Sequence, residues 1–411
     1  MARPIVMISS HPPRRCRVAD FCQEACEFLR KSHPERDVLV ITHTDGAGEG
    51  ALPIINMTRA NWWKPAAEKV RQLDPHVVHV QHEYGLYEYH DDRGHNDRGE
   101  GFLDLLDALG DYPLIVEPHT VHGRLLDYEA DFLFRLCRRA GVVLVKCQYQ
   151  KWRLGWNFTA LGWPTPRNLM VVPYGARPDR RLRLDEIQPM RKELGLEEGP
   201  LARRLVGLVG WSLGNKRWEI LTSMWDQIAE EILRRSGQEW NLLAEAPLHE
   251  QDNNLKQAPK QPVVEKRLPC RYYEFSPHRG QGGNDKLLAV CDFIVLPSAD
   301  ETQAGTLARI IALNKPYVAA APAEVLTAQT LESQGGLLFS TKEALKQRVI
   351  ELACNENLRM KLGGNLKEYL DKVVSWEVVV RQYDQAYELA RSARVTGRPV
   401  SLPTDFDLAA M

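Results

Sequence analysis

Short runs of apolar residues alternate with segments of helical periodicity along almost the whole chain. The runs Ile5 to Ile8, Val142 to Val145 and Leu205 to Val209 are short and apolar at nearly every position. Strands of this kind are buried on both faces, as in a parallel sheet that carries helices on either side. The sequence therefore predicts an α/β fold built from doubly wound parallel sheets.

The alternating pattern occurs twice, in two series that a charged, proline-containing stretch at 177–200 separates. A chain of 411 residues also exceeds what one hydrophobic core usually serves. We therefore predict an N-terminal domain over residues 1–180 and a C-terminal domain over residues 181–375, with strand-end loops that imply a cleft between them. Ser375 suits the start of a further helix, because its side chain accepts hydrogen bonds from free backbone N–H groups. We assign this helix to residues 376–395.

Composition and charge exclude several classes of protein. The formal net charge is −1 and 26% of the residues are charged, so nothing draws the whole chain to nucleic acid. No stretch approaches the apolar length of a membrane span, and the first residues reverse the charge order of a secretory signal. The eight cysteines are scattered and never form CxxC, which favours buried thiols. We expect a cytoplasmic protein without a nucleic-acid partner.

The stretch from Cys291 to Glu324 reads as strand, polar loop, helix and strand. Asp300 and Glu301 follow the strand, and Gly305 begins the helix. A polar loop at the carboxyl end of a strand, next to a helix N-terminus, is where open α/β sheets bind ligands. Glu301 there suits a sugar hydroxyl, and the helix start suits a phosphate. The alternative is that Glu301 only caps the helix.

Two other loops carry residues suited to chemistry. The segment Gly210 to Lys216 joins a strand to a helix, so its glycines give backbone access and Lys216 suits a phosphate. It lacks P-loop spacing, and a tight turn with a solvated lysine is the alternative. His119 follows the strand 114–117 and suits a base or a hydroxyl ligand, with a structural histidine as the alternative. The His- and Asp-rich loop 82–100 matches no zinc pattern, so we predict a polar loop without metal.

Seven short segments occur in an order that matches a known enzyme family. They are Ser10 to Cys16, His79 to Gly85, His119 to Val121, Val172 to Gly175, Gly210 to Lys216, Glu301 to Thr306, and Ser375 with Trp376. On these segments the chain resembles, over nearly its whole length, the retaining family-4 glycosyltransferases of GT-B fold. It is most similar to a bacterial subgroup that opens with a proline-arginine-cysteine loop.

The resemblance implies transfer of a hexosyl unit from a nucleotide-diphosphate sugar to a hydroxyl acceptor, with retention at the anomeric carbon and without a metal or another cofactor. It implies that Lys216 stabilises the leaving nucleotide, that Glu301 binds the donor sugar, and that His119 lies near the reacting centre. The implied donor-binding residues are Gly210, Trp211, Asn215, Lys216, Arg217, Glu301, Gln303, Gly305 and Thr306, and those on the acceptor side are Arg14, Arg15, His82, Glu83 and Tyr84.

Two departures from the family leave the donor open. Trp211 stands where relatives commonly have arginine, with Arg217 as a substitute, and Arg309 stands where relatives have a ribose-binding glutamate. A phosphorylase or an epimerase of the same fold, and a non-catalytic protein that binds nucleotide sugars or glycans, are the alternatives. The acceptor is a sugar, a small molecule or a lipid-linked hydroxyl. Arg135, Arg138 and Arg139 on one helix form either a membrane-facing surface or a solvated face.

Overall fold

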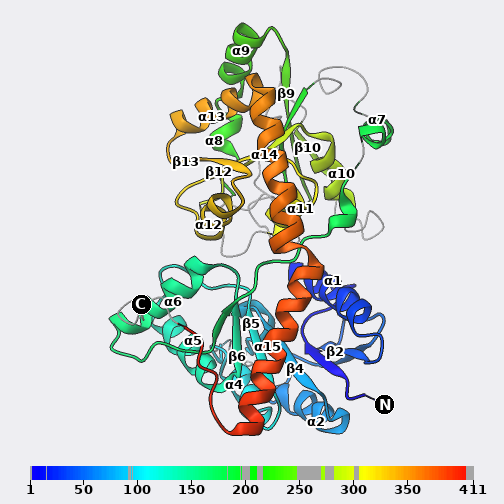
Figure 1. The fold of residues 1–411 in the computed structure, drawn as a ribbon, viewed down its shortest axis with the longest axis vertical. Helices are drawn as coiled ribbons and strands as arrows, with labels where there is room; N and C mark the ends of the chain where they lie inside the picture. Colours follow the sequence, from blue (N-terminus) through cyan, green and yellow to red (C-terminus); the bar gives the residue numbers. More distant parts are fainter. Residues whose placement is uncertain are drawn as a thin grey trace. The chain divides into compact units, whose positions relative to one another are not determined.

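The computed structural model describes residues 2–14, 16–90, 94, 96–182, 184–194, 196, 204–210, 216–247, 270–273, 282–299 and 305–403. The chain forms two compact units (Figure 1). Unit 1 consists of Met1–Tyr174 together with Trp376–Met411, and unit 2 of Gly175–Ser375. The units thus separate after Tyr174, six residues before the boundary placed at 180 from the sequence.

Unit 1 contains a seven-stranded sheet in the order β3-β2-β1-β4-β5-β6-β7, and its paired strands are parallel. The strands are β1 (Ile5–Ile8), β2 (Val38–His43), β3 (Ala51–Ile55), β4 (Val77–His82), β5 (Leu114–Pro118), β6 (Val142–Val145) and β7 (Leu169–Val171). The edge strand β3 was not predicted. It contains Pro53, which an edge strand tolerates because one side of its backbone has no partner strand.

Helices cover both faces of this sheet: α1 (Arg17–Ser32), α2 (Trp63–Leu73), α3 (Tyr84–Tyr87), α4 (Glu100–Ala108), α5 (Asp127–Arg139), α6 (Gln148–Ala160) and α15 (Trp376–Thr396). Successive strand residues point to opposite faces, so Val6 and Ile8 join the core with α2, α4 and α5. Ile5 and Met7 join a second core with α1 and α15. Both faces of the sheet are covered by helices and shielded from water, which explains why these strands are apolar throughout.

Helix α15 belongs to unit 1, although more than 200 residues separate it from the rest of that unit. It packs beside α1 (Figure 1). Trp376, at its start, is fully buried, and its indole Nε1 donates a hydrogen bond to Glu24 of α1 at 3.0 Å. Its Val379, Val380 and Tyr383 lie in the same core as the strand residues.

Unit 2 contains a six-stranded parallel sheet in the order β10-β9-β8-β11-β12-β13. Its strands are β8 (Arg204–Val209), β9 (Trp240–Pro247), β10 (Cys270–Tyr273), β11 (Phe293–Leu296), β12 (Tyr317–Ala320) and β13 (Gly336–Phe339). Its helical segments are η1 (Pro178–Arg180), α7 (Leu184–Glu193), α8 (Glu219–Thr222), α9 (Trp225–Ser236), α10 (Gly282–Val290), α11 (Gly305–Ala312), α12 (Glu324–Ser333), α13 (Lys342–Cys354), α14 (Glu356–Tyr369) and the π-helical turn η5 (Leu370–Val374).

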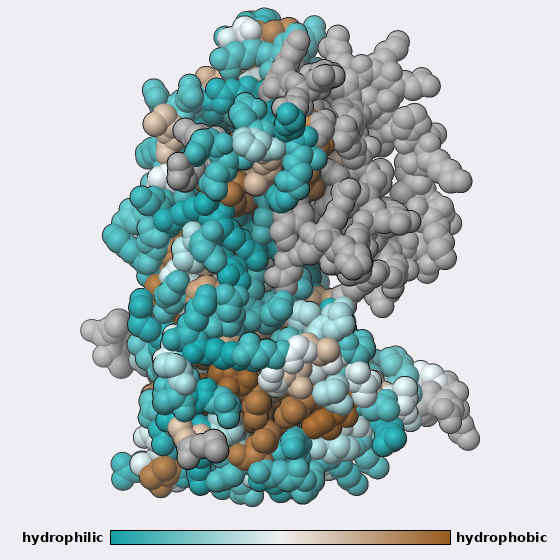
Figure 2. All heavy atoms as spheres, turned by 90° about the vertical axis from the view of Figure 1, so that its right-hand side faces the viewer, coloured by the Kyte–Doolittle hydropathy of each residue, from teal (hydrophilic) through white to brown (hydrophobic). Residues whose placement is uncertain are grey.

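Two sequence predictions in unit 2 were wrong. The stretch 177–200 was interpreted as a linker, but it contains η1 and α7, a helix that tolerates Pro189 in its interior. The apolar periodicity of Trp218 to Leu233 predicts one amphipathic helix, but this segment is divided into α8 and α9, which end and begin on either side of Ser223 and Met224. Within the described residues, no helix combines the length and apolarity needed to span a bilayer. On the face drawn in Figure 2 hydrophilic side chains predominate, and apolar side chains gather on unit 1.

Candidate functional site

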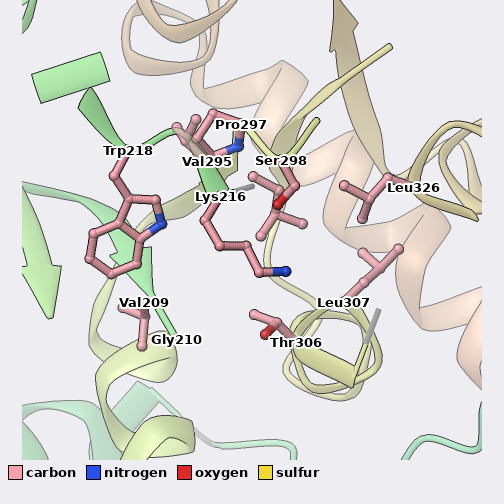
Figure 3. Close-up of a pocket in the computed structure, with 11 residues that line it drawn as sticks. Val209, Gly210, Lys216, Trp218, Val295, Pro297, Ser298, Thr306, Leu307 and Leu326 are labelled. Atoms are coloured by element: carbon pink, nitrogen blue, oxygen red, sulfur yellow. The ribbon is translucent and has the colours of Figure 1, made fainter. Parts of the chain in front are cut away.

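A pocket in unit 2 lies at the carboxyl ends of β8 and β11 (Figure 3). These two strands are neighbours in the sheet, and the chain order changes direction between them, because β9 and β10 lie on one side and β12 and β13 on the other. Open parallel sheets bind ligands at such a switch point, outside the carboxyl ends of the strands. The empty space at this pocket, counted together with the open solvent at its mouth, is about 390 Å³.

Three residues predicted from the sequence to bind the donor line this pocket together: Gly210, Lys216 and Thr306. Lys216 extends its side chain across the pocket towards Thr306 (Figure 3). Thr306 lies in the first turn of α11, where backbone N–H groups have no partner within the helix and carry partial positive charge. An ammonium group and a helix N-terminus on one pocket are suited to an anion such as a phosphate.

Gly210 is required by the geometry of this pocket. Its φ is +133°, a conformation that side chains with a Cβ rarely adopt. A Cβ placed there would lie 3.3 Å from Oγ1 of Thr306. The glycine therefore brings the backbone after β8 close to the start of α11.

The rest of the lining is largely apolar. Val209, Val295, Leu296, Leu307 and Leu326 contribute aliphatic side chains, and Trp218 contributes an indole that was not predicted from the sequence. Ligand sites commonly combine such apolar walls with a few polar groups that fix orientation. Apolar walls also lower the local dielectric, so a charge at Lys216 acts more strongly on a bound anion than it would in water.

Arg217 has a different place from the one predicted. Its Nε donates a hydrogen bond to the carbonyl oxygen of Pro297 at 3.0 Å. This contact links the chain after β8 to the end of β11, the two walls of the pocket. We conclude that Arg217 holds the pocket together, and it is not among the residues that line it.

Several predicted residues lie outside the part of the chain that the structure describes. They are Arg15, Trp211, Asn215, Glu301 and Gln303, together with Asp91, Asp92 and His95 of the loop considered for metal. Gly305 begins α11 and is described. Within the described ranges, no group of three or more His, Cys, Asp or Glu side chains is arranged to hold a metal ion.

Arg309 lies one turn beyond Thr306 on α11. Its guanidinium contacts Asp285 of α10 at 3.4 Å, and Arg180 contacts the same carboxylate at 2.8 Å. One half-buried carboxylate thus faces two arginines. The position at which the family resemblance implies a ribose-binding glutamate is therefore occupied by an arginine of this cluster.

In unit 1, His119 directly follows β5 and is buried. Its backbone N–H donates to the carbonyl oxygen of His82 at 2.8 Å, which joins the ends of β5 and β4. Its ring meets Phe21 of α1 edge-on, with the ring centroids 4.9 Å apart. Glu83 and Thr120 join the same two loops, because Thr120 Oγ1 donates to Glu83 Oε2 at 2.7 Å.

A buried charged network lies two residues before His119 and was missed from the sequence. Glu117 and Lys146 form an ion pair with both side chains fully enclosed. The Glu117 carboxylate also accepts hydrogen bonds from His79 Nε2 at 3.1 Å and from the Tyr383 hydroxyl of α15 at 3.1 Å. Burial alone would raise the pKa of Glu117, but Lys146 and His79 hold it well below its usual range.

This network reaches His119 through one aromatic ring. The Lys146 ammonium lies 4.7 Å from the centroid of the Phe21 ring, whose edge contacts His119. Burial lowers the pKa of Lys146, an effect that the Glu117 carboxylate opposes. The only sequence signal was a glutamate and a lysine at the ends of two apolar runs, where charged residues are ordinary.

The predicted acceptor-side residues have mixed environments. The His82 ring is enclosed by Phe102 and Phe132, at centroid distances of 4.6 and 4.9 Å, and burial lowers its pKa to about 3. His82 is therefore a neutral ring packed in the core. Burial raises the pKa of Glu83, while the bond from Thr120 opposes the shift. Tyr84 packs on the His82 ring.

Three arginines from the predicted acceptor side and from the α5 surface pair with carboxylates: Arg14, Arg135 and Arg139. Arg14 contacts both carboxylate oxygens of Asp45 at 3.0 Å. On α5, Arg135 pairs with Glu100 at 2.5 Å and Arg139 with Asp107 at 2.8 Å. These ion pairs favour a solvated face for α5 over the membrane-facing surface.

Comparison with known proteins gives limited sequence similarity and extensive structural similarity. No family model matches the chain. A stretch of 100 residues is 34% identical to an uncharacterised glycosyltransferase of Methanocaldococcus jannaschii, and it covers 24% of this chain. The match spans only 28% of the length of that relative.

Solved structures resemble the whole chain. WaaG, a glycosyltransferase involved in lipopolysaccharide biosynthesis, has a TM-score of 0.62 at 14% identity, over 93% of this chain and 99% of WaaG. HepE of Anabaena, solved with UDP, has a TM-score of 0.66 at 15% identity, over 94% and 99%. Sucrose-phosphate synthase of Thermosynechococcus elongatus has a TM-score of 0.66 at 15% identity, over 95% and 100%. The fold is therefore the GT-B fold predicted from the sequence.

Proposed function

We propose that this protein is a glycosyltransferase that moves a hexosyl unit from a nucleotide-diphosphate sugar to a hydroxyl acceptor, with retention at the anomeric carbon and without a metal. One observation carries the proposal: Lys216 and the N-terminus of α11 meet at one pocket, at the switch point of the second sheet. The HepE structures that contain UDP and UDP-glucose, and the partial match to a glycosyltransferase, support this choice of substrate class.

The proposed chemistry places the donor diphosphate in the pocket. When the glycosidic bond to the donor breaks, negative charge develops on the departing diphosphate oxygen. Lys216 and the N–H groups of the first turn of α11 stabilise that charge, and they bind it more tightly in the transition state than in the ground state. Gly210 leaves room for the diphosphate next to the backbone.

The donor sugar and the acceptor are assigned by the same proposal. Glu301 binds hydroxyl groups of the donor sugar from the loop between β11 and α11. The acceptor hydroxyl binds at the carboxyl ends of β4 and β5, where His119, Glu83 and Thr120 are joined by hydrogen bonds. The raised pKa of Glu83 favours a carboxyl that takes a proton more readily than an exposed one.

A nucleotide screen tests this function. The melting temperature of the full chain is measured with UDP, GDP and ADP, since a ligand that binds only the folded state raises it. We expect UDP to give the largest shift, followed by release of UDP from UDP-glucose when an acceptor is added. No shift with any of the three nucleotides would overturn the proposal, and a shift without turnover of any donor would reassign the chain to a nucleotide-binding protein.

A further inference from the structure

The pocket of unit 2 has an aromatic wall to which the proposed chemistry gives no role. Trp218 lines the pocket together with Lys216, which lies two residues earlier in the chain. The residue is half-buried and directly precedes α8. Its indole stands on one side of the pocket, and Leu307 and Leu326 stand on the opposite side (Figure 3). An indole in this place offers a large, flat apolar surface to a ligand.

The backbone is fixed on both sides of Trp218. The Trp218 carbonyl oxygen accepts a hydrogen bond from the N–H of Thr222 at 3.1 Å. Arg217, the residue before it, has a φ of +48°, and its Nε donates to the carbonyl oxygen of Pro297 at 3.0 Å. Residues with a Cβ rarely take a positive φ, and strained conformations of this kind cluster at ligand sites. The strained residue lies between Lys216 and Trp218, whose side chains both line the pocket.

The pocket thus combines two kinds of binding group. The Lys216 ammonium and the first turn of α11, which contains Thr306, suit an anionic diphosphate. The indole of Trp218 suits a planar aromatic group, because stacked rings attract one another beyond the effect of the area that they bury. A nucleoside diphosphate carries both an anion and an aromatic base, whereas inorganic phosphate or a lipid-linked phosphate carries only the anion.

We propose that Trp218 stacks on the base of the nucleotide donor. The proposed function assigns the donor sugar to the loop that leads into α11, and the nucleoside is attached to the other end of the diphosphate. The nucleoside is therefore directed to the side of the pocket that Trp218 forms. Base stacking on an aromatic side chain depends little on which base is present, so Trp218 raises the affinity for nucleotides as a class. This inference rests on the proposed function, because it needs the nucleotide in this pocket.

Isothermal titration calorimetry of the full chain with UDP and with inorganic pyrophosphate tests the stacking. Trp218→Leu keeps an apolar side chain and removes the ring, so we expect it to weaken UDP binding about 5- to 100-fold. Its affinity for pyrophosphate, which has no base, should stay within about twofold of the wild type. Trp218→Phe keeps a ring that can stack, and it should bind UDP more tightly than Trp218→Leu does.

Two control variants and two further readouts separate stacking from a loss of structure. Lys216→Ala should weaken the binding of UDP and of pyrophosphate alike, because both ligands carry the anion. Trp156→Ala removes a partly exposed indole from α6 of unit 1 and should bind both ligands like the wild type. UDP should quench the tryptophan emission of the wild type more than that of Trp218→Phe, and pyrophosphate should quench neither. The melting temperature of each variant without ligand reports folding separately.

Specific results would overturn the stacking by Trp218. These are an unchanged UDP affinity of Trp218→Leu, an equal loss of affinity for UDP and pyrophosphate, or equal UDP affinities of Trp218→Leu and Trp218→Phe. A Trp218→Leu variant that binds UDP normally and UDP-glucose weakly would assign the indole to the donor sugar instead. In each of these cases, UDP binding by the wild type leaves the proposed function standing. A wild type that binds none of UDP, GDP and ADP would overturn the proposed function itself.

Discussion

Lys216 lines the unit 2 pocket, and we propose that its positive charge binds the donor diphosphate there. A hydrogen bond to a charged group contributes about 1.5–3 kcal/mol. We therefore predict that Lys216→Ala weakens UDP binding about 10- to 100-fold, measured by isothermal titration calorimetry. Lys361→Ala removes an exposed lysine from α14 and serves as the control. Equal affinity of the Lys216→Ala variant and the control would contradict the assignment of Lys216.

Gly210 has a backbone conformation that we expect to be strained when the glycine is replaced by a residue with a Cβ. At φ +133°, Gly210→Ala places a Cβ in a region that only glycine occupies readily, 3.3 Å from Thr306 Oγ1. Such strain costs on the order of 1–3 kcal/mol. We predict a lower free energy of unfolding in urea and weaker UDP binding.

A second glycine gives the matched control. Gly364 lies inside α14, and a Cβ added there meets nothing within 4 Å. Gly364→Ala is expected to stabilise the chain by up to about 1 kcal/mol, because alanine favours the helix more than glycine does. Equal effects of the two substitutions would show that the backbone at Gly210 is not strained.

At the scale of elements, the sequence predicted those whose apolar residues follow one clear period. Helices α1 and α5 have apolar residues on one face, and the sequence predicts them over 18–29 and 127–139, close to the observed ranges. Helix α6 was missed because Trp152 and Trp156 lie on its exposed side while Phe158 is buried, so the apolar residues surround the helix. Strand β3 was missed because Pro53 interrupts its apolar run, and a proline argues against a strand.

The same limits apply to the candidate site. Gly210, Lys216 and Thr306 were predicted because glycines and a lysine in a strand-to-helix loop are a local signal, and the structure places all three on one pocket. Trp218 and the Glu117 network were not predicted. Their roles depend on which strands are neighbours and on a helix that returns from the far end of the chain, and no local pattern carries that information.

The Glu117 network joins β5, β6 and α15, and its loss should destabilise unit 1. Removing one partner of a buried ion pair costs about 3–5 kcal/mol, since the other charge stays buried without compensation. We predict this loss for Glu117→Gln, measured by urea unfolding. Glu117→Gln/Lys146→Met is expected to be more stable than Glu117→Gln, because it also removes the unpaired ammonium. Glu377→Gln, at an exposed position of α15, is the control.

The Glu117 network also predicts how the free energy of unfolding depends on pH. The pKa of Glu117 is lower in the folded chain than its ordinary value of 4.5, so the folded state favours the carboxylate. Its contribution to stability is therefore complete above about pH 4.5 and is lost as the pH falls towards the folded pKa. The free energy of unfolding of the wild type should fall more steeply below pH 4.5 than that of Glu117→Gln. Parallel curves would contradict the lowered pKa.

At the scale of the whole molecule, the Phe21 ring of unit 1 contacts the two residues that flank the segment forming unit 2. The chain leaves unit 1 after Tyr174 and returns at Trp376. The Phe21 ring centroid lies 4.6 Å from that of Tyr174 and 5.1 Å from that of Trp376. Phe21 also contacts His119 and the Lys146 ammonium. The Phe21 ring thus lies between the residues at which the two units are connected and His119, which we assign to the acceptor side.

The described residues of the pocket that we propose binds the nucleotide all come from unit 2, and this predicts where UDP protects the chain. A ligand at 100 times its dissociation constant stabilises the state that it binds by about 2.7 kcal/mol. In hydrogen-exchange mass spectrometry we expect UDP to slow exchange in the segments 204–210, 293–298 and 305–312, which form or adjoin the pocket. Exchange in β4 and β5 of unit 1 should change little, because no pocket residue lies there. Equal protection of both units by UDP alone would contradict a nucleotide site built by unit 2. Protection of β4 and β5 only after an acceptor is added would agree with the proposal that unit 2 binds the donor and unit 1 binds the acceptor.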